Sequence, residues 1–282
     1  MAIKILVDSA SDISLKEAKE MGIELISMQI TFNNEDYLDG VDLLPREFYE
    51  KLIESDTLPK TSQINPFRFS EVFENLVNEG NEVIAIVLSS KLSNTYNNAL
   101  QASMEFDGKV LVVDSLSAAA GERVLVELAL RLIEEGKSLK EIYDILMKKR
   151  HNIQVMALLN TLEYLKKGGR ISSAVSFAGE LLSLKPVIAI VDGEVKLIGK
   201  ARGSKNGNNL INKLVEEKGV DYSLPYSAVS SGTNDELLQK YIKDSTPIYI
   251  DKIKKLPIHL IGSTIGTHVG PGAIGVVFFS LN

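Results

Sequence analysis

The chain contains no cysteine among its 282 residues. Disulfides, thiolate nucleophiles and Cys-based zinc or iron–sulfur sites are therefore excluded, and the composition fits a reducing compartment, by default the cytoplasm. A basic surplus is also lacking, because 31 Lys and Arg stand against 37 Asp and Glu, for a formal net charge of -6. Without an excess of positive charge to bind a phosphate backbone, we do not expect a nucleic acid as a partner.

Long apolar runs and common catalytic signatures are also missing. No stretch approaches the roughly eighteen uninterrupted apolar residues of a membrane span, and the apolar run in the opening MAIKILVDSASD is too short for a signal peptide. There is no GxSxG elbow, SxxK, Walker loop or HExxH. The only histidines are His151, His259 and His268. We therefore expect a soluble cytoplasmic protein without a metal site.

The first half of the chain alternates apolar, β-branched runs with segments of helical period. Strands are predicted over 3–7, 83–88 and 110–113, and helices over 14–21, 66–80, 117–135 and 139–149. This alternation predicts an α/β domain with a parallel sheet. Residues 24–41 break it, because a strand-like run over 24–32 is followed by turn residues, which predicts a small hairpin insertion.

After His151 the pattern of predicted strands and helices changes. Strand-like VMALL and a short helix ending in KKGGR precede two strands, PVIAIV and VKLIG, joined at Asp192 and Gly193. Such a tight hairpin requires antiparallel pairing, and the run AIGVVFF near the C-terminus adds another strand. The sequence thus predicts two domains, a parallel-sheet α/β domain over 1–152 and a mixed-sheet α/β domain over 153–282.

A cluster of hydroxyl side chains follows the buried run VIAIVL. The segment SSKLSNTY places Ser89, Ser90, Ser93, Thr95 and Tyr96 at the edge of the sheet where parallel sheets commonly bind ligands. These donors carry no charge and have no evident base beside them. They predict a pocket that holds an anion by hydrogen bonds, next to apolar walls, without attacking it.

Five sequence blocks occur together, in order: ILVDSASD, PKTSQ, SSKLSNTY, LEYLKKGGRIS and GTHVGPGAIGV. In these blocks the chain resembles the DegV family of bacterial fatty-acid-binding proteins, as one unit over 3–280. The resemblance implies that one long-chain fatty acid, such as palmitate or oleate, lies in an apolar tunnel between two domains. It also implies that the carboxylate is presented to a separate fatty acid kinase, which forms an acyl phosphate for phospholipid synthesis.

The resemblance further implies a binding protein and not an enzyme, with no catalytic residue, no cofactor and no metal. We expect a monomer that contacts a membrane surface transiently while it exchanges its ligand.

Carried over by position, Thr61 and Ser93 are similar to the hydroxyls that bind the carboxylate in this family. Ser62, Arg170 and His268 are similar to members of the network around the head group. Simpler interpretations stay open: Thr61 and Ser93 as turn and N-cap residues, Ser62 as a local backbone partner, Arg170 as a helix-end residue and His268 as a structural histidine.

One residue departs from the family pattern. Asn94 stands after Ser93, where the family generally has glycine. Asn is the residue other than glycine that best tolerates left-handed backbone, so we expect the site to survive.

The segment KLIGKARGSKNG concentrates basic residues, Lys196, Lys200, Arg202 and Lys205, without an acid among them. In the family, a position similar to Arg202 is implicated in contact with the kinase, and a basic patch also favours an anionic membrane surface. The simpler interpretation is a solvated loop at the start of a helix.

An enzyme is the alternative from another class. The family's fold is similar to the substrate-binding half of dihydroxyacetone kinase, so a phosphotransferase subunit or a hydrolase could act on a small substrate through Ser93 or His268. Asp8 and Asp12 in the opening block could suggest an aspartyl-phosphate enzyme, but a strand-end Asp that satisfies the next turn is the simpler interpretation.

Overall fold

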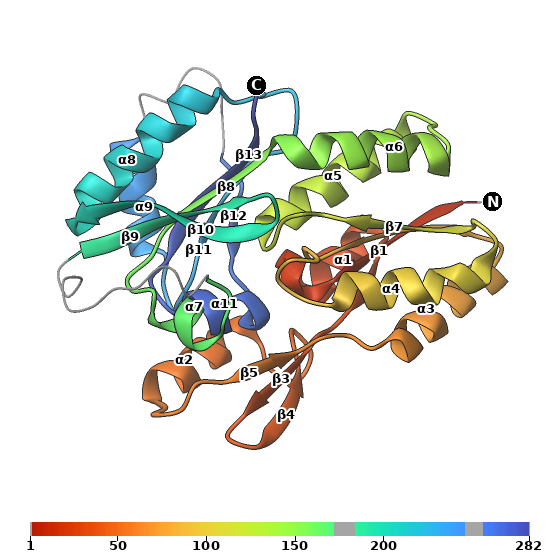
Figure 1. Ribbon diagram of the computed structural model, residues 1–282, viewed down its shortest axis with the longest axis horizontal. Helices are drawn as coiled ribbons and strands as arrows, with labels where there is room; N and C mark the ends of the chain where they lie inside the picture. The colour runs from red at the N-terminus through yellow and green to blue at the C-terminus, as the bar shows by residue number, and fades with distance from the viewer. Residues whose placement is uncertain (1, 172–183, 246–255, 282) are drawn as a thin grey trace.

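The computed structural model describes residues 2–171, 184–245 and 256–281, and these form three β-sheets (Figure 1). The first sheet is all parallel, in the order β2-β1-β6-β7. Its strands are β1 (Ile3–Asp8), β2 (Glu24–Ile26), β6 (Glu82–Val87) and β7 (Val110–Asp114). The two central strands, β1 and β6, are almost continuous apolar runs, because both faces of the sheet are covered.

Helices cover both faces of this parallel sheet. Helices α3 and α4 pack on one face, and α5 and α6 pack on the other. The capping boxes at Ser14 and Ser138 fix where α1 and α6 begin. The bounds are α1 Leu15–Met21, α3 Pro66–Asn78, α4 Thr95–Ser103, α5 Ala120–Glu134 and α6 Leu139–Lys149, with short 3-10 helices at Ser9–Ser11, Met104–Phe106 and Arg150–Asn152.

The second sheet is mixed, in the order β10-β9-β8-β13-β11-β12. Among the described strands of this sheet, only the β11–β12 pair is parallel. Helices α8 and α9 cover its outer face. The bounds are β8 Ile153–Leu158, α7 Glu163–Lys167, β9 Leu184–Val191, β10 Glu194–Arg202, α8 Gly203–Lys218, β11 Ser227–Ser230, α9 Glu236–Asp244, β12 Ile258–Leu260, α11 Ser263–Val269 and β13 Ile274–Phe279.

Helix α5 lies between the two large sheets. It contacts β1 and β6 of the parallel sheet, and β8, β11 and β13 of the mixed sheet. Ten of its fifteen residues are buried, as expected for a helix that is covered on more than one side. The largest apolar cluster therefore contains side chains from both sheets, such as Ile84 and Phe279.

The predicted hairpin joins β9 to β10. Asp192 and Gly193 both have positive φ, 52° and 83°, which a tight two-residue turn between antiparallel strands requires. The Ser89 hydroxyl donates to the carbonyl of Gly193 at 2.8 Å. A Cβ at Gly193 would lie 2.6 Å from the Ser89 Oγ, so glycine allows the hairpin to touch the end of the parallel sheet. Ser89, predicted as a ligand donor, instead joins the two halves of the chain.

The third sheet is small, and it corrects the prediction for residues 24–41. The run over 24–32 is not one strand, because β2 belongs to the parallel sheet and only β3 and β4 form the hairpin. The backbone N–H of Met28 donates to the Ser9 hydroxyl at 3.0 Å and not to a strand partner, so the chain turns there. The elements are β3 Gln29–Phe32, β4 Glu35–Leu38, α2 Pro45–Glu54 and β5 Lys60–Ser62.

These sheets confirm the predicted α/β class, with a parallel sheet followed by a mixed one. The mixed sheet begins at Ile153, and the boundary after residue 152 stays a prediction.

Candidate functional site

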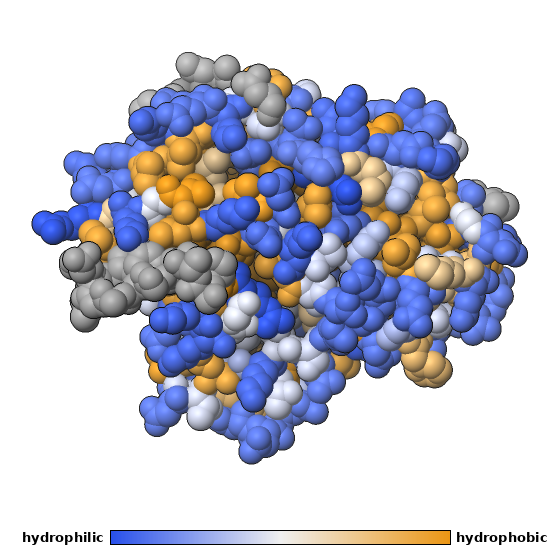
Figure 2. Space-filling view, in the orientation of Figure 1, coloured by the Kyte–Doolittle hydropathy of each residue, from blue (hydrophilic) through white to orange (hydrophobic). Residues whose placement is uncertain are grey.

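An apolar cavity of about 380 Å³ lies among the three sheets. Its walls come from β8, β9, β11 and β13 of the mixed sheet, from α11, and from the segments that follow β6 and precede α5. In Figure 2, apolar surface gathers around the hollow at the centre of the face shown. Its size falls in the range of small-molecule sites. Apolar lining side chains include Val155, Ala157, Ile188, Val229, Ile265 and Val269.

Thr61 and His268 form a polar part of the cavity wall. Thr61 lies on β5 and His268 on α11, and Thr61 Oγ1 is 3.0 Å from His268 Nε2. Burial, reinforced by the charge of Arg170, lowers the pKa of His268 to about 4. The ring is therefore neutral at pH 7, and only one of its two nitrogens carries a proton.

Arg170 joins two loops beside this pair. It follows the Gly-Gly turn after α7, and its Nη1 donates to the carbonyl of Gly168 at 2.6 Å. Its Nε donates to the carbonyl of Leu92 at 3.3 Å, which places the guanidinium next to the loop that carries Ser93. The half-buried Arg170 is a cation of the cavity wall. Ser172, at the end of the LEYLKKGGRIS block, lies outside the described residues.

Ser93 also lines the cavity, and its hydroxyl belongs to a short chain of hydrogen bonds. Its Oγ is 2.9 Å from Thr95 Oγ1 and accepts from the backbone N–H of Thr95 at 3.3 Å. The buried Thr95 Oγ1 accepts in turn from the N–H of Ile64 at 3.4 Å. Ser93 is thus a local turn residue and a cavity residue at once, so the two interpretations of it are compatible.

The structure brings all five predicted cavity residues to one chamber: Thr61, Ser62, Ser93, Arg170 and His268. Gln63 and Thr264 line it too and were missed. Gln63 belongs to the PKTSQ block, so this motif was a reason to include it in the site. Thr264 lies before the GTHVG block, and no motif indicated it.

Asn94 corrects one expectation. Its φ is -78°, so the backbone there is not left-handed, and the replacement of glycine by Asn brings no strain. Its side chain instead forms hydrogen bonds with Asn97 and Asn98 along the first turn of α4.

Two buried carboxylates hold the start of α11 and so position His268. Asp12 accepts from the N–H of Gly262 at 2.8 Å, and Asp39 accepts from the N–H groups of Ser263 and Thr264, both at 3.2 Å. Burial raises the pKa of both carboxyl groups. Carboxylates at this helix end are favourable because the first N–H groups of a helix lack partners within it.

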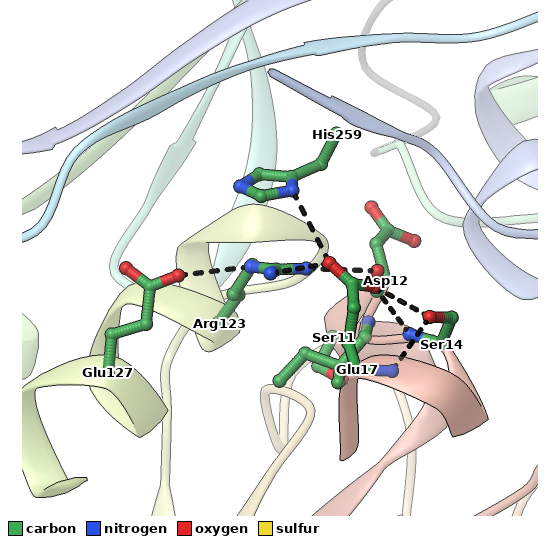
Figure 3. A network of polar contacts seen from close by, with 8 residues as sticks. Ser11, Asp12, Ser14, Glu17, Arg123, Glu127 and His259 are labelled. Atoms are coloured by element: carbon green, nitrogen blue, oxygen red, sulfur yellow. Dashed lines mark hydrogen bonds and ion pairs between the residues drawn. The ribbon is translucent and has the colours of Figure 1, made fainter. Parts of the chain in front are cut away.

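Figure 3 shows the network around Asp12. The Arg123 guanidinium lies 2.7 Å from Glu17 and 3.1 Å from Glu127, so it ties α1 to α5. Burial alone would raise the pKa of Glu17, but hydrogen bonds from Arg123 and Ser14 outweigh it and lower the pKa to about 2. His259 Nδ1 lies 3.9 Å from Glu17, and burial lowers the pKa of this histidine to about 4. The network joins α1, α5 and β12.

Arg202 lies apart from the cavity. It is the last residue of β10 and is exposed. Lys196 and Lys200 are exposed on the same strand, and Lys205 on the first turn of α8. Lys196 is 3.6 Å from Glu194, an exposed pair that offsets part of the positive charge.

The geometry offers little to the enzyme alternative. In the described part of the chain, the side-chain hydrogen bonds of Ser93 go to Thr95, and His268 bonds Thr61, so no histidine is hydrogen-bonded to the serine. Asp8 accepts from the N–H groups of Ala10 and Leu88, and burial raises its pKa to about 6. This carboxyl satisfies the turn after β1.

Two further findings concern only the described residues. No group of three or more His, Asp or Glu residues there is arranged to hold a metal ion. None of the helices there has both the length and the apolar character needed to cross a bilayer.

Comparisons with known proteins agree over nearly the whole chain. The model of a family described as uncharacterised, the DegV family, matches residues 2–281. A DegV domain-containing protein of Clostridium perfringens is 34% identical over 285 residues, which cover 97% of this chain and 96% of that protein.

Two solved structures share the fold. A DegV family protein from Thermus thermophilus, described for its fatty acid binding, is 31% identical with a TM-score of 0.89, and 100% of both chains is covered. A DegV lipid-binding protein from Thermotoga maritima is 29% identical with a TM-score of 0.86, over 100% of this chain and 99% of that one.

Proposed function

Because the chain belongs to the DegV family, we propose that it binds a long-chain fatty acid in the cleft between domains 1–152 and 153–282. The observation that carries this proposal is the apolar cavity of about 380 Å³, which has uncharged hydroxyls and a neutral histidine in one wall. The acyl chain occupies the apolar part, and the carboxylate meets Thr61 and Ser93. The fatty acid binding of the Thermus thermophilus relative and the lipid binding of the Thermotoga maritima relative support this assignment.

Two hydrogen-bond relays direct the hydroxyl protons toward the carboxylate. With the proton of His268 on Nε2, the ring donates to Thr61 Oγ1, and the Thr61 hydroxyl is free to donate to the ligand. In the same way, Thr95 Oγ1 accepts from the N–H of Ile64 and donates its proton to Ser93, which leaves the Ser93 proton for the ligand. Each bond to a carboxylate contributes about 1.5–3 kcal/mol.

The acyl chain supplies most of the affinity. About fifteen methylenes at about 0.8 kcal/mol each give roughly 12 kcal/mol before ordering costs. The hydroxyls therefore orient the head group, and the ligand escapes slowly into water. A membrane or partner surface is the route of exchange.

We further propose that the protein presents the carboxylate to a separate fatty acid kinase and is not itself an enzyme. Hydroxyl donors leave one carboxylate oxygen open to phosphorylation, whereas a lysine covering it would block transfer. Arg202 and its basic neighbours, which are exposed and away from the cavity, are the proposed contact for the kinase or for an anionic membrane surface.

Mass spectrometry of the protein after denaturation tests the binding. The protein expressed in bacteria is expected to release a saturated or monounsaturated fatty acid. A protein that is lipid-free after mild purification, and that takes up neither palmitate nor oleate, would overturn the proposal.

Presentation is tested by acyl-phosphate formation with a fatty acid kinase present. Arg202→Ala is expected to slow the transfer without weakening fatty acid retention, whereas Lys213→Ala, on the exposed side of α8, is the control with the same change of charge. Equal rates for the two variants would remove Arg202 from the interface. Turnover of acyl esters or of ATP by the isolated protein, lost in Ser93→Ala, would favour the enzyme alternative instead.

A further inference from the structure

A second cavity adjoins the polar wall of the apolar one. It has a volume of about 330 Å³, and three residues line both cavities: Thr61, Arg170 and His268. The second cavity is bounded by the start of β5 and the residues before it on one side, and by α7 with its Gly-Gly turn on the other. A group attached to a carboxylate held at Thr61 is therefore within reach of a second chamber.

The second cavity carries positive charge. Lys60, Lys167 and Arg170 line it, and no Asp or Glu of the described residues does. This local charge opposes the net charge of -6 of the whole chain. Lys167 lies 2.5 Å from Glu163, but both side chains are more than half exposed, at 60% and 55%. An exposed pair of this kind contributes little to stability, so Lys167 can turn toward an anion.

The wall between the cavities is closely packed. A Cβ at Gly168 would lie 2.3 Å from His268 Nδ1, so glycine lets the turn after α7 rest against the imidazole. Arg170 donates to the Gly168 carbonyl at 2.6 Å, so this carbonyl already has a hydrogen-bond donor. His268 Nδ1 is buried and has no hydrogen-bond partner among the described residues. The neutral ring thus separates an apolar chamber from a basic one.

We propose that the second cavity is an oxoanion subsite that holds the phosphoryl group of an acyl phosphate whose chain lies in the apolar cavity. This inference rests on the proposed function, since it requires an acyl carboxyl group at Thr61. An acyl phosphate carries more negative charge than a fatty acid, and the added charge lies beyond the carboxyl carbon. Three cations at that place favour the phosphorylated ligand over the acid.

The test compares two ligands of equal chain length, palmitate and a hydrolysis-resistant palmitoyl phosphonate. Their dissociation constants are measured for the full chain at fixed ionic strength, because screening changes interactions between exposed charges. The double variant Lys60→Ala with Lys167→Ala is expected to bind the phosphonate on the order of tenfold more weakly, with palmitate binding unchanged within about twofold. Lys140→Ala with Lys213→Ala is the control with the same change of charge. Each of these lysines is exposed and, like Lys167, is paired with an acid one helical turn away, and neither lines either of the two cavities.

The subsite would be overturned if the double variant lost the same factor of affinity for palmitate as for the phosphonate. It would also be overturned if the double variant and the control lost the same factor of affinity for the phosphonate. In a second measurement, inorganic phosphate is expected to compete with the phosphonate and to leave palmitate binding unchanged. Phosphate that weakens both ligands equally would also overturn it. If the wild-type protein binds neither ligand, the proposed function itself fails, and this result is distinct from a loss confined to the lysine variant.

Discussion

Ala157→Leu is expected to shorten the acyl chain that the protein prefers. Ala157 lies on β8, lines the apolar cavity, and belongs to the same apolar cluster as Leu165 and Ile188, which line the cavity too. A leucine there adds three carbon atoms. Because it extends into a cavity and not into a packed core, we expect no large cost of overpacking.

The magnitude follows from the methylenes that the leucine displaces. If three carbons of side chain expel about three methylenes of the ligand, at about 0.8 kcal/mol each, palmitate binding weakens by roughly 2.4 kcal/mol. Since 1.4 kcal/mol corresponds to a factor of ten, the dissociation constant is expected to rise about fiftyfold. A saturated acid that is three carbons shorter does not reach the blocked region, so its binding is expected to change little.

Isothermal titration with the two acids, together with melting temperatures of both proteins, checks the prediction. The comparison between the two acids within one variant is the internal control for general damage to the site. A variant that binds palmitate as the wild type does, or that loses the same factor for both acids, would refute the placement of the acyl chain along β8.

Three further outcomes are expected. Thr61→Val retains the shape of the side chain but removes a hydrogen-bond donor, so fatty acid binding should weaken by about tenfold. Thr95→Val should have a smaller effect in the same assay, because Thr95 acts through Ser93. Full binding by Thr61→Val would contradict the head-group assignment. The pKa of His268 is lowered to about 4 in the folded protein, whereas the unfolded chain takes up this proton near pH 6.5. The contribution of the neutral ring to the free energy of unfolding is therefore full above about pH 6.5 and is lost as the pH falls toward 4. Urea unfolding should therefore show that His268→Gln loses roughly 2 kcal/mol less stability than the wild type between pH 7 and pH 5, and identical losses would mean that the ring is not buried as a neutral group. Gly168→Ala should lower the melting temperature and weaken binding, because its Cβ would lie 2.3 Å from His268 Nδ1, whereas Gly136→Ala, in an open turn, should leave binding unchanged.

Most regular elements of the first half follow from the sequence, although helix α2 was not predicted. Helix α6 has the predicted bounds, since a capping box and a helical period both mark them locally. The run over 24–32 was predicted as one strand, and this was wrong because the break at Met28 depends on a hydrogen bond to Ser9, nineteen residues away. Strand β5 was missed for a similar reason: its three residues are a strand only because β3 lies beside them.

The amino-acid sequence by itself determined the fold class, the family and five polar residues that line the apolar cavity, because local periodicity and short motifs carry that information. Only the tertiary structure decided that Thr61 and His268, 207 residues apart, are in hydrogen-bond contact. It also decided that the Ser89 hydroxyl bonds the Gly193 carbonyl of the β9–β10 hairpin, and that a basic cavity adjoins the apolar one. Cavities and contacts of this kind arise where distant segments pack together, and the spacing of residues along the chain does not record the space left between them.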